Sequence, residues 1–306
     1  MTTRTAFILP GQGSQKLGML DLIPENDTFV RLLDAAEALS GLDLRVLAAA
    51  GEPDELADTR VAQPLLYLAD WAWGIALMDC RVVPDVLAGH SLGELAALAL
   101  AGVYSVEAGL ELVVERSRLM AMTAANTPGG MSAVLGLPAS VILEAIDGLE
   151  GVWVANDNSA GQVVISGTDS GIEAATAKLT EAGARRIIPL KVAGPFHSPL
   201  MEPARAAFED IVRQAEFNNA SIPVVQNTSP TPVTDAELIR ERLITQITSP
   251  VRWTETLSAL VADGPIVLIE SGPGTVLRGL ARGIEGITAV SVEDTPLQTI
   301  AEEVVA

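Results

Sequence analysis

Short apolar runs of strand length alternate along this chain with segments of helical periodicity. The run Thr5–Leu9 leads into a glycine-rich turn, and Val61–Met78 has the length and composition of a buried helix. Asp85–Gly89 and Leu92–Ala101 then repeat the order of strand and helix, and Val106–Ala124 continues the helical pattern. Alternation of this kind is typical of an α/β protein with a parallel sheet.

The order of elements changes between residues 128 and 192. We predict a strand, a helix, two strands, a helix and a strand there, at Met131–Leu135, Ala139–Leu149, Val152–Ala155, Gln162–Ser166, Ser170–Ala182 and Ala184–Val192. The polar segment Asn156–Gly161 is expected to be the turn between the two middle strands. The order βαββαβ is that of the ferredoxin-like, split βαβ arrangement. We therefore expect a small subdomain of residues 128–192, inserted into a larger one formed by 1–127 and 193–306.

The pattern of strand, glycine turn and helix returns in the last third of the chain. We predict helices at Met201–Phe217, Ala236–Ile247 and Thr254–Ala262, and strands at Ile222–Gln226 and Ile266–Glu270. A further helix is expected to start at Thr275. The acidic segment Pro296–Ala306 is expected to form a surface helix. Loops at the carboxyl edge of a parallel sheet are where ligands bind, so candidate chemistry is sought in these turns.

Composition narrows the possible classes of protein. Hydrophobic residues make up 49% of the 306 positions, which excludes a disordered chain. The net charge of −20 argues against nucleic-acid binding and against docking on an anionic membrane. One cysteine and two histidines argue against a disulfide or a metal site. The most apolar stretch, Pro64–Met78, is shorter than the about 18 residues of a membrane span, and no signal peptide is recognised. We expect a soluble, cytoplasmic protein.

The clearest chemical motif is Gly89-His90-Ser91-Leu92-Gly93, a G-x-S-x-G sequence between a predicted strand and a predicted helix. A serine on such a sharp turn projects its hydroxyl outward, and the small flanking residues let helix and strand approach each other. The alternative is a chance glycine turn. In this context the motif favours Ser91 as a nucleophile.

A serine hydroxyl needs a base that accepts its proton. His90 is adjacent to Ser91, where neighbouring side chains diverge, so we assign it to packing and hydrogen bonding around the turn. This leaves His197, in a loop between a predicted strand and a predicted helix. A lone histidine is often a surface or core residue. With a nucleophile in place and no rival base, His197 is the candidate general base.

Two further features could complete such a site. The glycine turn after the first strand could aim the backbone N–H of Gln12 at the oxygen that the Leu92 N–H would contact, as an oxyanion hole requires. A phosphate-binding loop or a plain turn are the alternatives, although no Walker A sequence follows. Arg116 and Arg118 point about 200° apart on one helix, so one of them can face inward and clamp a carboxylate. The alternative is that both lie at the surface.

Together these residues identify a family. The ordered motifs are Gly11-Gln12-Gly13-Ser14-Gln15, Ala62-Gln63-Pro64, Gly89-His90-Ser91-Leu92-Gly93-Glu94, Arg116, Met131-Ser132-Ala133, Pro195-Phe196-His197-Ser198 and Ser271-Gly272-Pro273-Gly274. From Phe7 to about Gly283 the chain resembles the malonyl-CoA:acyl-carrier-protein transacylases, the family that also includes polyketide synthase acyltransferase domains.

The resemblance implies an α/β-hydrolase-like large subdomain with a ferredoxin-like insertion. It also implies ping-pong transfer of malonyl from malonyl-CoA, through an ester on Ser91, to the phosphopantetheine thiol of an acyl carrier protein in fatty acid or polyketide biosynthesis. His197 would be the base, and Gln12 and Leu92 would match the oxyanion-hole positions. Arg116 would match the arginine that pairs with the malonyl carboxylate. The backbone carbonyl of Gln246 would match the one that orients the histidine.

The resemblance extends to selectivity and partners. Phe196 resembles the malonyl-selective form of its loop, where a bulky ring crowds an α-methyl branch, so methylmalonyl should be disfavoured. Arg185 and Arg186 match a position that the family is thought to use for the acidic carrier protein, although they could equally be two solvated arginines. No cofactor is implied beyond these substrates, and we expect a monomer.

Other functions remain open from the sequence. A serine thioesterase or esterase would share the turn at Ser91, but it would have no use for an inward Arg116. A free-standing polyketide synthase acyltransferase with another acyl group, or the malonyl-loading subunit of a malonate decarboxylase, would keep the transfer and change the pathway. An inactive scaffold that docks carrier proteins is a fourth possibility.

Overall fold

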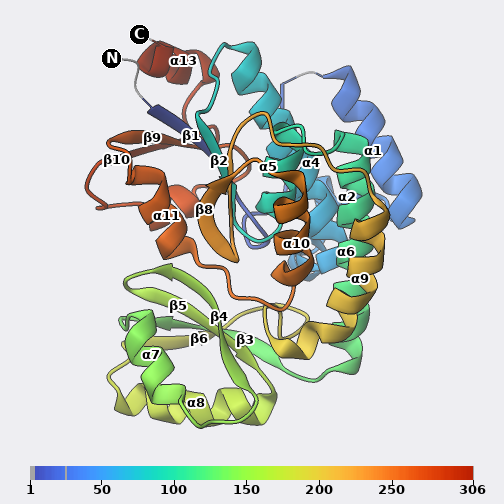
Figure 1. The fold of residues 1–306 in the computed structure, drawn as a ribbon. Coiled ribbons are helices and arrows are strands. Elements are labelled where there is room, and N and C mark those ends of the chain that lie inside the picture. The colour runs from blue at the N-terminus through green and yellow to red at the C-terminus, as the bar shows by residue number, and fades with distance from the viewer. Residues whose placement is uncertain (1–3, 25, 306) are drawn as a thin grey trace.

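The computed structural model describes residues 4–24 and 26–305 and arranges them around two sheets (Figure 1). Within these residues the larger sheet has the strand order β10–β9–β1–β2–β7–β8. Its strands are β1 (Arg4–Leu9), β2 (Val86–Gly89), β7 (Val224–Gln226), β8 (Ser229–Val233), β9 (Ile266–Glu270) and β10 (Ile287–Ser291). All neighbours are parallel except β7 and β8. The predicted parallel sheet is confirmed, and β8 adds an antiparallel edge because two residues join it to β7, too few for a parallel crossover.

Side chains alternate between the two faces of this sheet, as the period of a strand requires. Phe7, Leu9 and Leu87 belong to one core, whereas Ala6 and Ile8 belong to another. Most of the helices cover the first core. They are α1 (Asp27–Ser40), α2 (Leu44–Ala50), α3 (Pro53–Ala57), α4 (Thr59–Asp79), α5 (Gly93–Leu100), α6 (Val106–Asn126), α9 (Glu202–Gln214), α10 (Ala236–Gln246) and α13 (Leu297–Val305). The short 3-10 helix η1 (Pro199–Met201) precedes α9 on the same side. The second is covered by α11 (Trp253–Val261) and α12 (Val276–Leu280). The C-terminal helix that was expected between Pro296 and Ala306 is α13, and Ala306 lies outside the described residues.

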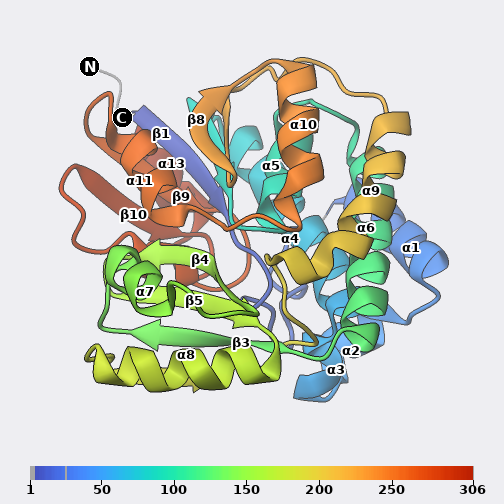
Figure 2. The same cartoon turned by 60° about the horizontal axis from the view of Figure 1, so that its bottom comes forward.

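The smaller sheet has the order β4–β5–β3–β6 and is antiparallel. Its elements are β3 (Gly130–Leu135), α7 (Ala139–Ile146), β4 (Val152–Ser159), β5 (Gln162–Gly167), α8 (Asp169–Glu181) and β6 (Arg186–Pro189). Helices α7 and α8 cover one face, over a core that includes Ile142, Ile165 and Leu179 (Figure 2). This is the ferredoxin-like arrangement that the sequence predicted.

The boundary of β4 differs from the prediction. The strand continues through Asn156 to Ser159, where a polar turn was expected, and only Ala160 and Gly161 form the turn. The reason is tertiary pairing: Asn156 forms a bridge with Val251, and Asp157 donates its N–H to the Val251 carbonyl at 2.9 Å. The backbone partners of the large subdomain therefore hold these polar residues extended. Three other elements end earlier than predicted: α7 at Ile146 instead of Leu149, β6 at Pro189 instead of Val192, and α9 at Gln214 instead of Phe217.

The carboxyl ends of three adjacent strands define one edge of the larger sheet. Leu9 of β1 pairs with Gly89 of β2, and Ile8 pairs with Glu270 of β9. The turns that follow these strands therefore emerge side by side, facing the small subdomain (Figures 1 and 2). Among the helices in the described part of the chain, none has both the length and the apolar character that a membrane span requires.

Candidate active site

Ser91 lies on a sharp turn between β2 and α5. Its φ of 51° is in the left-handed region, which a side chain seldom adopts. A Cβ on Gly89 would lie 2.0 Å from the carbonyl carbon of Gly93, and a Cβ on Gly93 would lie 2.0 Å from the Leu9 carbonyl oxygen. Only glycine fits at either position, so the backbone of β1, β2 and α5 holds the serine in this strained conformation.

His197 faces Ser91 from the segment between β6 and η1. Its Nε2 lies 2.8 Å from Ser91 Oγ, and its Nδ1 lies 3.1 Å from the carbonyl oxygens of both Gln246 and Ser249. Because carbonyls only accept hydrogen bonds, the proton sits on Nδ1 and Nε2 is free to accept the serine proton. Burial, helped by the positive charge of Arg116, lowers the pKa of His197 to about 3. The imidazole is therefore a neutral base at physiological pH.

Arg116 is completely buried beside this pair. Its Nη1 donates to Gln63 Oε1 at 2.7 Å, and its Nη2 donates to Gln246 Oε1 at 3.0 Å and lies 3.4 Å from Ser91 Oγ. Burial lowers the pKa of Arg116 to about 10, so the guanidinium is still charged at neutral pH. Arg118, two residues on, is exposed and pairs with Glu115. The structure thus brings the hydroxyl, the imidazole and one cation together.

The two backbone N–H groups expected to bind an oxyanion follow the paired strand ends Leu9 and Gly89. Both Gln12 and Leu92 line the cavity next to Ser91. Across residues 4–24 and 26–305, neither of these N–H groups donates to a protein acceptor. The Gln12 side chain is anchored away from the serine, at 3.0 Å from the carbonyl oxygen of Ala57. This geometry is compatible with an oxyanion hole, whose assignment stays a prediction.

The site opens into a cavity of about 410 Å³ between the two subdomains. Ser91 and His197 line it, and Phe196, which is buried, forms part of the wall beside the histidine. The apolar lining residues include Met120, Met131, Val164, Leu190, Val192, Val276, Leu277 and Leu280, and the other polar ones are Gln12, Ser14, Gln15, Gln63, His90, Asn156, Asn158 and Lys191. A cavity that combines apolar walls with a set of polar groups is typical of a small-molecule site. In the described part of the chain, no cluster of three or more His, Cys, Asp and Glu could hold a metal.

Arg185 and Arg186 lie outside this cavity. Arg186 is the first residue of β6, an edge strand of the smaller sheet, and both side chains are exposed. The chain reaches the cavity wall only after β6, at Leu190–Val192. The two arginines are therefore at the surface, at the start of the strand that leads to the cavity.

Three supporting residues carry roles that sequence reasoning did not assign. Asn227 accepts the Ser91 N–H at 2.7 Å and donates to the Gly89 carbonyl at 2.6 Å, so one amide clamps both sides of the turn. Gln63 holds Arg116, and Ser249 shares the orientation of His197 with Gln246. Gln63 was visible in a motif, and Asn227 directly follows a strand at the carboxyl edge of the sheet. Ser249 offered no signal.

His90 has the supporting role that the sequence suggested. Its Nε2 lies 2.8 Å from Asn158 Oδ1 of the small subdomain, and its ring centroid lies 5.4 Å from that of Trp253. Burial lowers the pKa of His90 and keeps it neutral. It therefore links the turn at Ser91 to the opposite wall of the cavity instead of competing with His197 for the serine proton.

Comparison with known proteins identifies the family of the chain. The sequence pattern of the acyl transferase domain family matches residues 6–301. The chain belongs to the acyl transferase family. The acyl transferase is 38% identical to the malonyl CoA-acyl carrier protein transacylase of Bacillus subtilis over 98% of both chains, and 40% identical to that of Synechocystis over 91% of this chain and 93% of the relative. A solved complex titled as a type II polyketide synthase acyl-carrier protein with its malonyl-transacylase matches with a TM-score of 0.91 at 36% identity, covering 98% of this chain and 99% of that one.

Proposed function

We propose that this acyl transferase moves a malonyl group from malonyl-CoA to the phosphopantetheine thiol of an acyl carrier protein, through a malonyl ester of Ser91. The observation that carries the proposal is the buried Arg116 guanidinium, 3.4 Å from Ser91 Oγ. A cation at that distance pairs with a carboxylate two bonds beyond the carbonyl that the serine attacks. A simple thioesterase or esterase has no use for it.

In the loading half-reaction, His197 Nε2 takes the Ser91 proton while Oγ attacks the thioester carbonyl. The N–H groups of Gln12 and Leu92 stabilise the oxyanion of the tetrahedral intermediate. This intermediate collapses, the C–S bond breaks, and the proton on His197 passes to the leaving CoA thiolate. In the second half-reaction the carrier thiol gives its proton to His197 and attacks the malonyl ester, and Ser91 leaves as a hydroxyl.

Two features fit transfer to a thiol. The apolar cavity wall accommodates a pantetheine arm, which both the donor and the acceptor carry. The ring of Phe196 forms the cavity wall beside His197 and limits the space next to the acyl group, so the α-methyl branch of a methylmalonyl group should be disfavoured. The backbone carbonyls of Gln246 and Ser249 orient His197. The proposed steps use only side chains and backbone N–H groups of this chain. The carrier belongs to fatty acid or polyketide biosynthesis in this proposal.

Intact-mass analysis after mixing with malonyl-CoA, methylmalonyl-CoA or acetyl-CoA tests the proposal. We expect the wild type to gain one malonyl group, with less from methylmalonyl-CoA, and to lose it when a carrier protein bearing phosphopantetheine is added. Ser91→Ala should gain nothing. Arg116→Ala should lose malonyl loading by about 100-fold or more while still accepting acetyl, because a charge pair with the substrate is removed. An unmodified wild type, or malonyl loading unchanged by Arg116→Ala, would contradict it.

A further inference from the structure

A second cavity adjoins the one that contains Ser91. It has a volume of about 600 Å³ and is lined by residues of α3, the start of α4, α6 and the segment that follows β6. Ala57, Lys191 and Val192 line both cavities, so the two share a wall. The steps proposed above do not use the second cavity.

Lys191 is a cation at the junction of the two cavities. Among the described residues that line the first cavity, it is the only lysine or arginine. Its neighbour Leu190 donates its N–H to the carbonyl of Met131 in β3 at 2.9 Å, which fixes this segment at the edge of the smaller sheet. The Lys191 side chain is 82% exposed. The ammonium group is therefore open to solvent at the boundary between the cavities.

Two other cations line the second cavity, and carboxylates hold both of them more firmly than Lys191 is held. Arg60 donates to the carboxylate of Asp58 from two nitrogens, at 2.6 and 3.1 Å, and Arg118 donates to a glutamate from two nitrogens, at 2.7 and 3.1 Å. Within residues 4–24 and 26–305, Lys191 makes a single contact of this kind, from Nζ to Asp54 Oδ1 at 3.3 Å, and Asp54 is 84% exposed. Water screens an exposed pair, so it contributes little. Lys191 is thus the cation that another anion can most readily engage.

We propose that Lys191 exchanges Asp54 for the phosphate group at the far end of the pantetheine arm. This inference rests on the proposed function, in which CoA and the carrier protein present the same phosphopantetheine arm. With the reacting thioester at Ser91 and the arm in the first cavity, the phosphate leaves that cavity where it meets the second. A lysine ammonium binds phosphate as a compact point charge. The phosphate keeps a negative charge at neutral pH both in the diphosphate of CoA and in the phosphodiester of a carrier protein.

The other charges around the second cavity limit this attraction to one residue. Asp54 and Asp58 line the cavity together with Arg60 and Arg118, so two acidic and two basic side chains face it besides Lys191. The cavity is therefore not a general anion site. CoA and the carrier protein differ beyond the shared phosphate, so a contact at Lys191 serves both half-reactions.

The experiment compares malonyl donors with and without the phosphate: malonyl-CoA, malonyl-phosphopantetheine and malonyl-pantetheine. The rate of Ser91 acylation at low donor concentration gives kcat/KM for each, and the ratio of a phosphorylated donor to malonyl-pantetheine measures the phosphate preference. We expect Lys191→Ala to lower this ratio by about tenfold for both phosphorylated donors, and Lys191→Glu to lower it further, while malonyl-pantetheine reacts as in the wild type. Asp54→Asn should raise the ratio, because the lysine loses its competing anion.

Lys178→Ala is the matched control. Lys178 lies on α8, is 56% exposed and forms one ion pair with Glu181 at 3.8 Å, and it is not among the residues that line either cavity. The variant therefore makes the same change in net charge and breaks the same kind of exposed pair. The second half-reaction repeats the comparison with phosphopantetheine and pantetheine as acceptors, and we expect Lys191→Ala to lower that ratio too.

The outcomes separate this inference from the proposed function. A wild type that takes malonyl from none of the three donors contradicts the function itself. A wild type that loads malonyl without a phosphate preference, or a Lys191→Ala variant that keeps the wild-type ratio, overturns the role of Lys191. An equal loss in Lys178→Ala would assign the effect to net charge. A loss confined to malonyl-CoA would place the nucleotide at Lys191 in place of the shared phosphate, and would also overturn the proposal.

Discussion

His197 works in a buried environment that keeps its imidazole neutral. Burial, Arg116 and His90 lower its pKa from 6.5 to about 3, against the hydrogen bonds to two carbonyls that raise it. The imidazole is neutral, and so able to accept the serine proton, at every pH above this pKa. It becomes protonated and inactive only as the pH falls through about 3. We therefore expect single-turnover acylation of Ser91 to be flat between about pH 5 and pH 8. Rapid-quench measurement across this range checks it, and an acid limb centred near 6.5 would contradict it.

The same shift affects stability with a defined sign. Below 6.5 the unfolded chain binds a proton on His197 that the folded chain does not. The free energy of unfolding is therefore unaffected by His197 above pH 6.5. It decreases as the pH falls from 6.5 toward about 3. Unfolding measured at each pH separates this loss from any change in the chemistry.

At the scale of single residues, the sequence was sufficient where a local motif or the scarcity of a residue type marks the chemistry, and insufficient where only the folded contacts reveal a role. Ser91 follows from its glycine motif and the strand before it, and His197 follows from the scarcity of bases. The inward position of Arg116 was one of two alternatives. Asn227 and Ser249 were not found, because no local motif marks an amide that accepts the Ser91 N–H or a second carbonyl that orients His197, and the carbonyl of Gln246 was expected only through the family resemblance.

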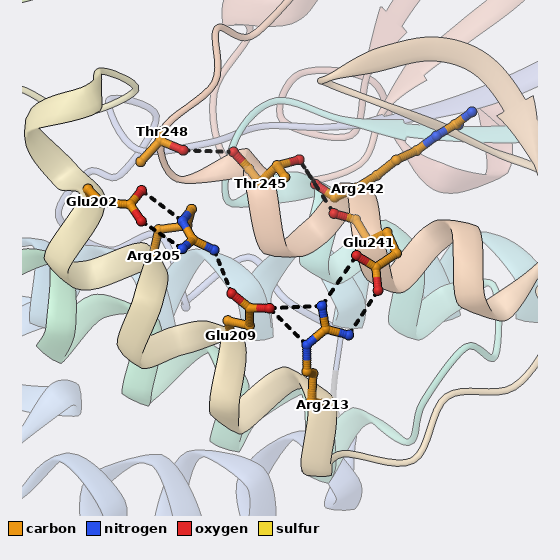
Figure 3. Close-up of polar contacts among 8 residues, drawn as sticks. All are labelled: Glu202, Arg205, Glu209, Arg213, Glu241, Arg242, Thr245 and Thr248. Carbon is orange, nitrogen blue, oxygen red and sulfur yellow. Dashed lines mark hydrogen bonds and ion pairs between the residues drawn. The ribbon is translucent and has the colours of Figure 1, made fainter.

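Helices α9 and α10 both help to position His197. His197 lies just before η1 and α9, and Gln246, the last residue of α10, supplies a carbonyl to His197. A ladder of ion pairs on the surface joins the two helices, from Glu202 and Arg205 through Glu209 and Arg213 to Glu241 (Figure 3). A separate contact holds the end of α9: Arg240 Nη1 donates to the carbonyls of Val212, Arg213 and Ala215, and its guanidinium lies 4.6 Å from the Phe217 ring centroid.

These two kinds of contact should differ in strength. Arg240 is 12% exposed, and Arg240→Ala would leave three carbonyls without their donor, so we expect the free energy of unfolding to fall by about 2 kcal/mol. Arg213→Ala removes two exposed ion pairs and should change it much less, since exposed pairs are screened by water. Urea unfolding of both variants tests this. Equal losses would show that the ladder carries the helix contact.

Most of the elements predicted from the sequence are present, but the helices α1 to α3 and the strand β10 were not predicted, and two other departures follow from tertiary pairing. Hydrophobic periodicity predicts buried strands and helices, as it did for β1, α4 and the βαββαβ unit. Polar Asn156–Ser159 resembled a turn, yet it is the end of β4, because Val251 of the large subdomain pairs with it. The edge strand β8, Ser-Pro-Thr-Pro-Val, has no apolar alternation and exists through its hairpin with β7.

The net charge of −20 affects how the whole molecule meets an acidic carrier protein. Long-range steering would be repulsive, so docking needs a local cluster of positive charge. Arg185 and Arg186 are exposed, and in the described part of the chain neither forms an ion pair, in contrast to Arg118 and Arg213. They remain candidates for this cluster.

Reversing both charges should weaken docking without touching the chemistry. In the variant with Arg185→Glu and Arg186→Glu we expect the KM for the carrier protein to rise about tenfold, and hydrolysis of malonyl-CoA to be unchanged. The matched control reverses Arg31 of α1 and Arg81 before the amino end of β2, which makes the same change in net charge away from the cavity. An equal rise in the control would assign the effect to overall charge, and an unchanged KM would reject the cluster.

The insertion of β3–β6 as one continuous stretch has an evolutionary consequence. It supplies Met131, Asn156, Asn158 and Val164 to one side of the cleft, whereas Ser91, His197 and Arg116 all belong to the other piece. Recombination or drift within that stretch can reshape what enters the cleft while leaving the reacting groups in register. We therefore expect changes in β3–β6 to alter the other contacts of a bound substrate, whereas Arg116 and Phe196, which select the acyl group in the proposed function, lie outside this stretch.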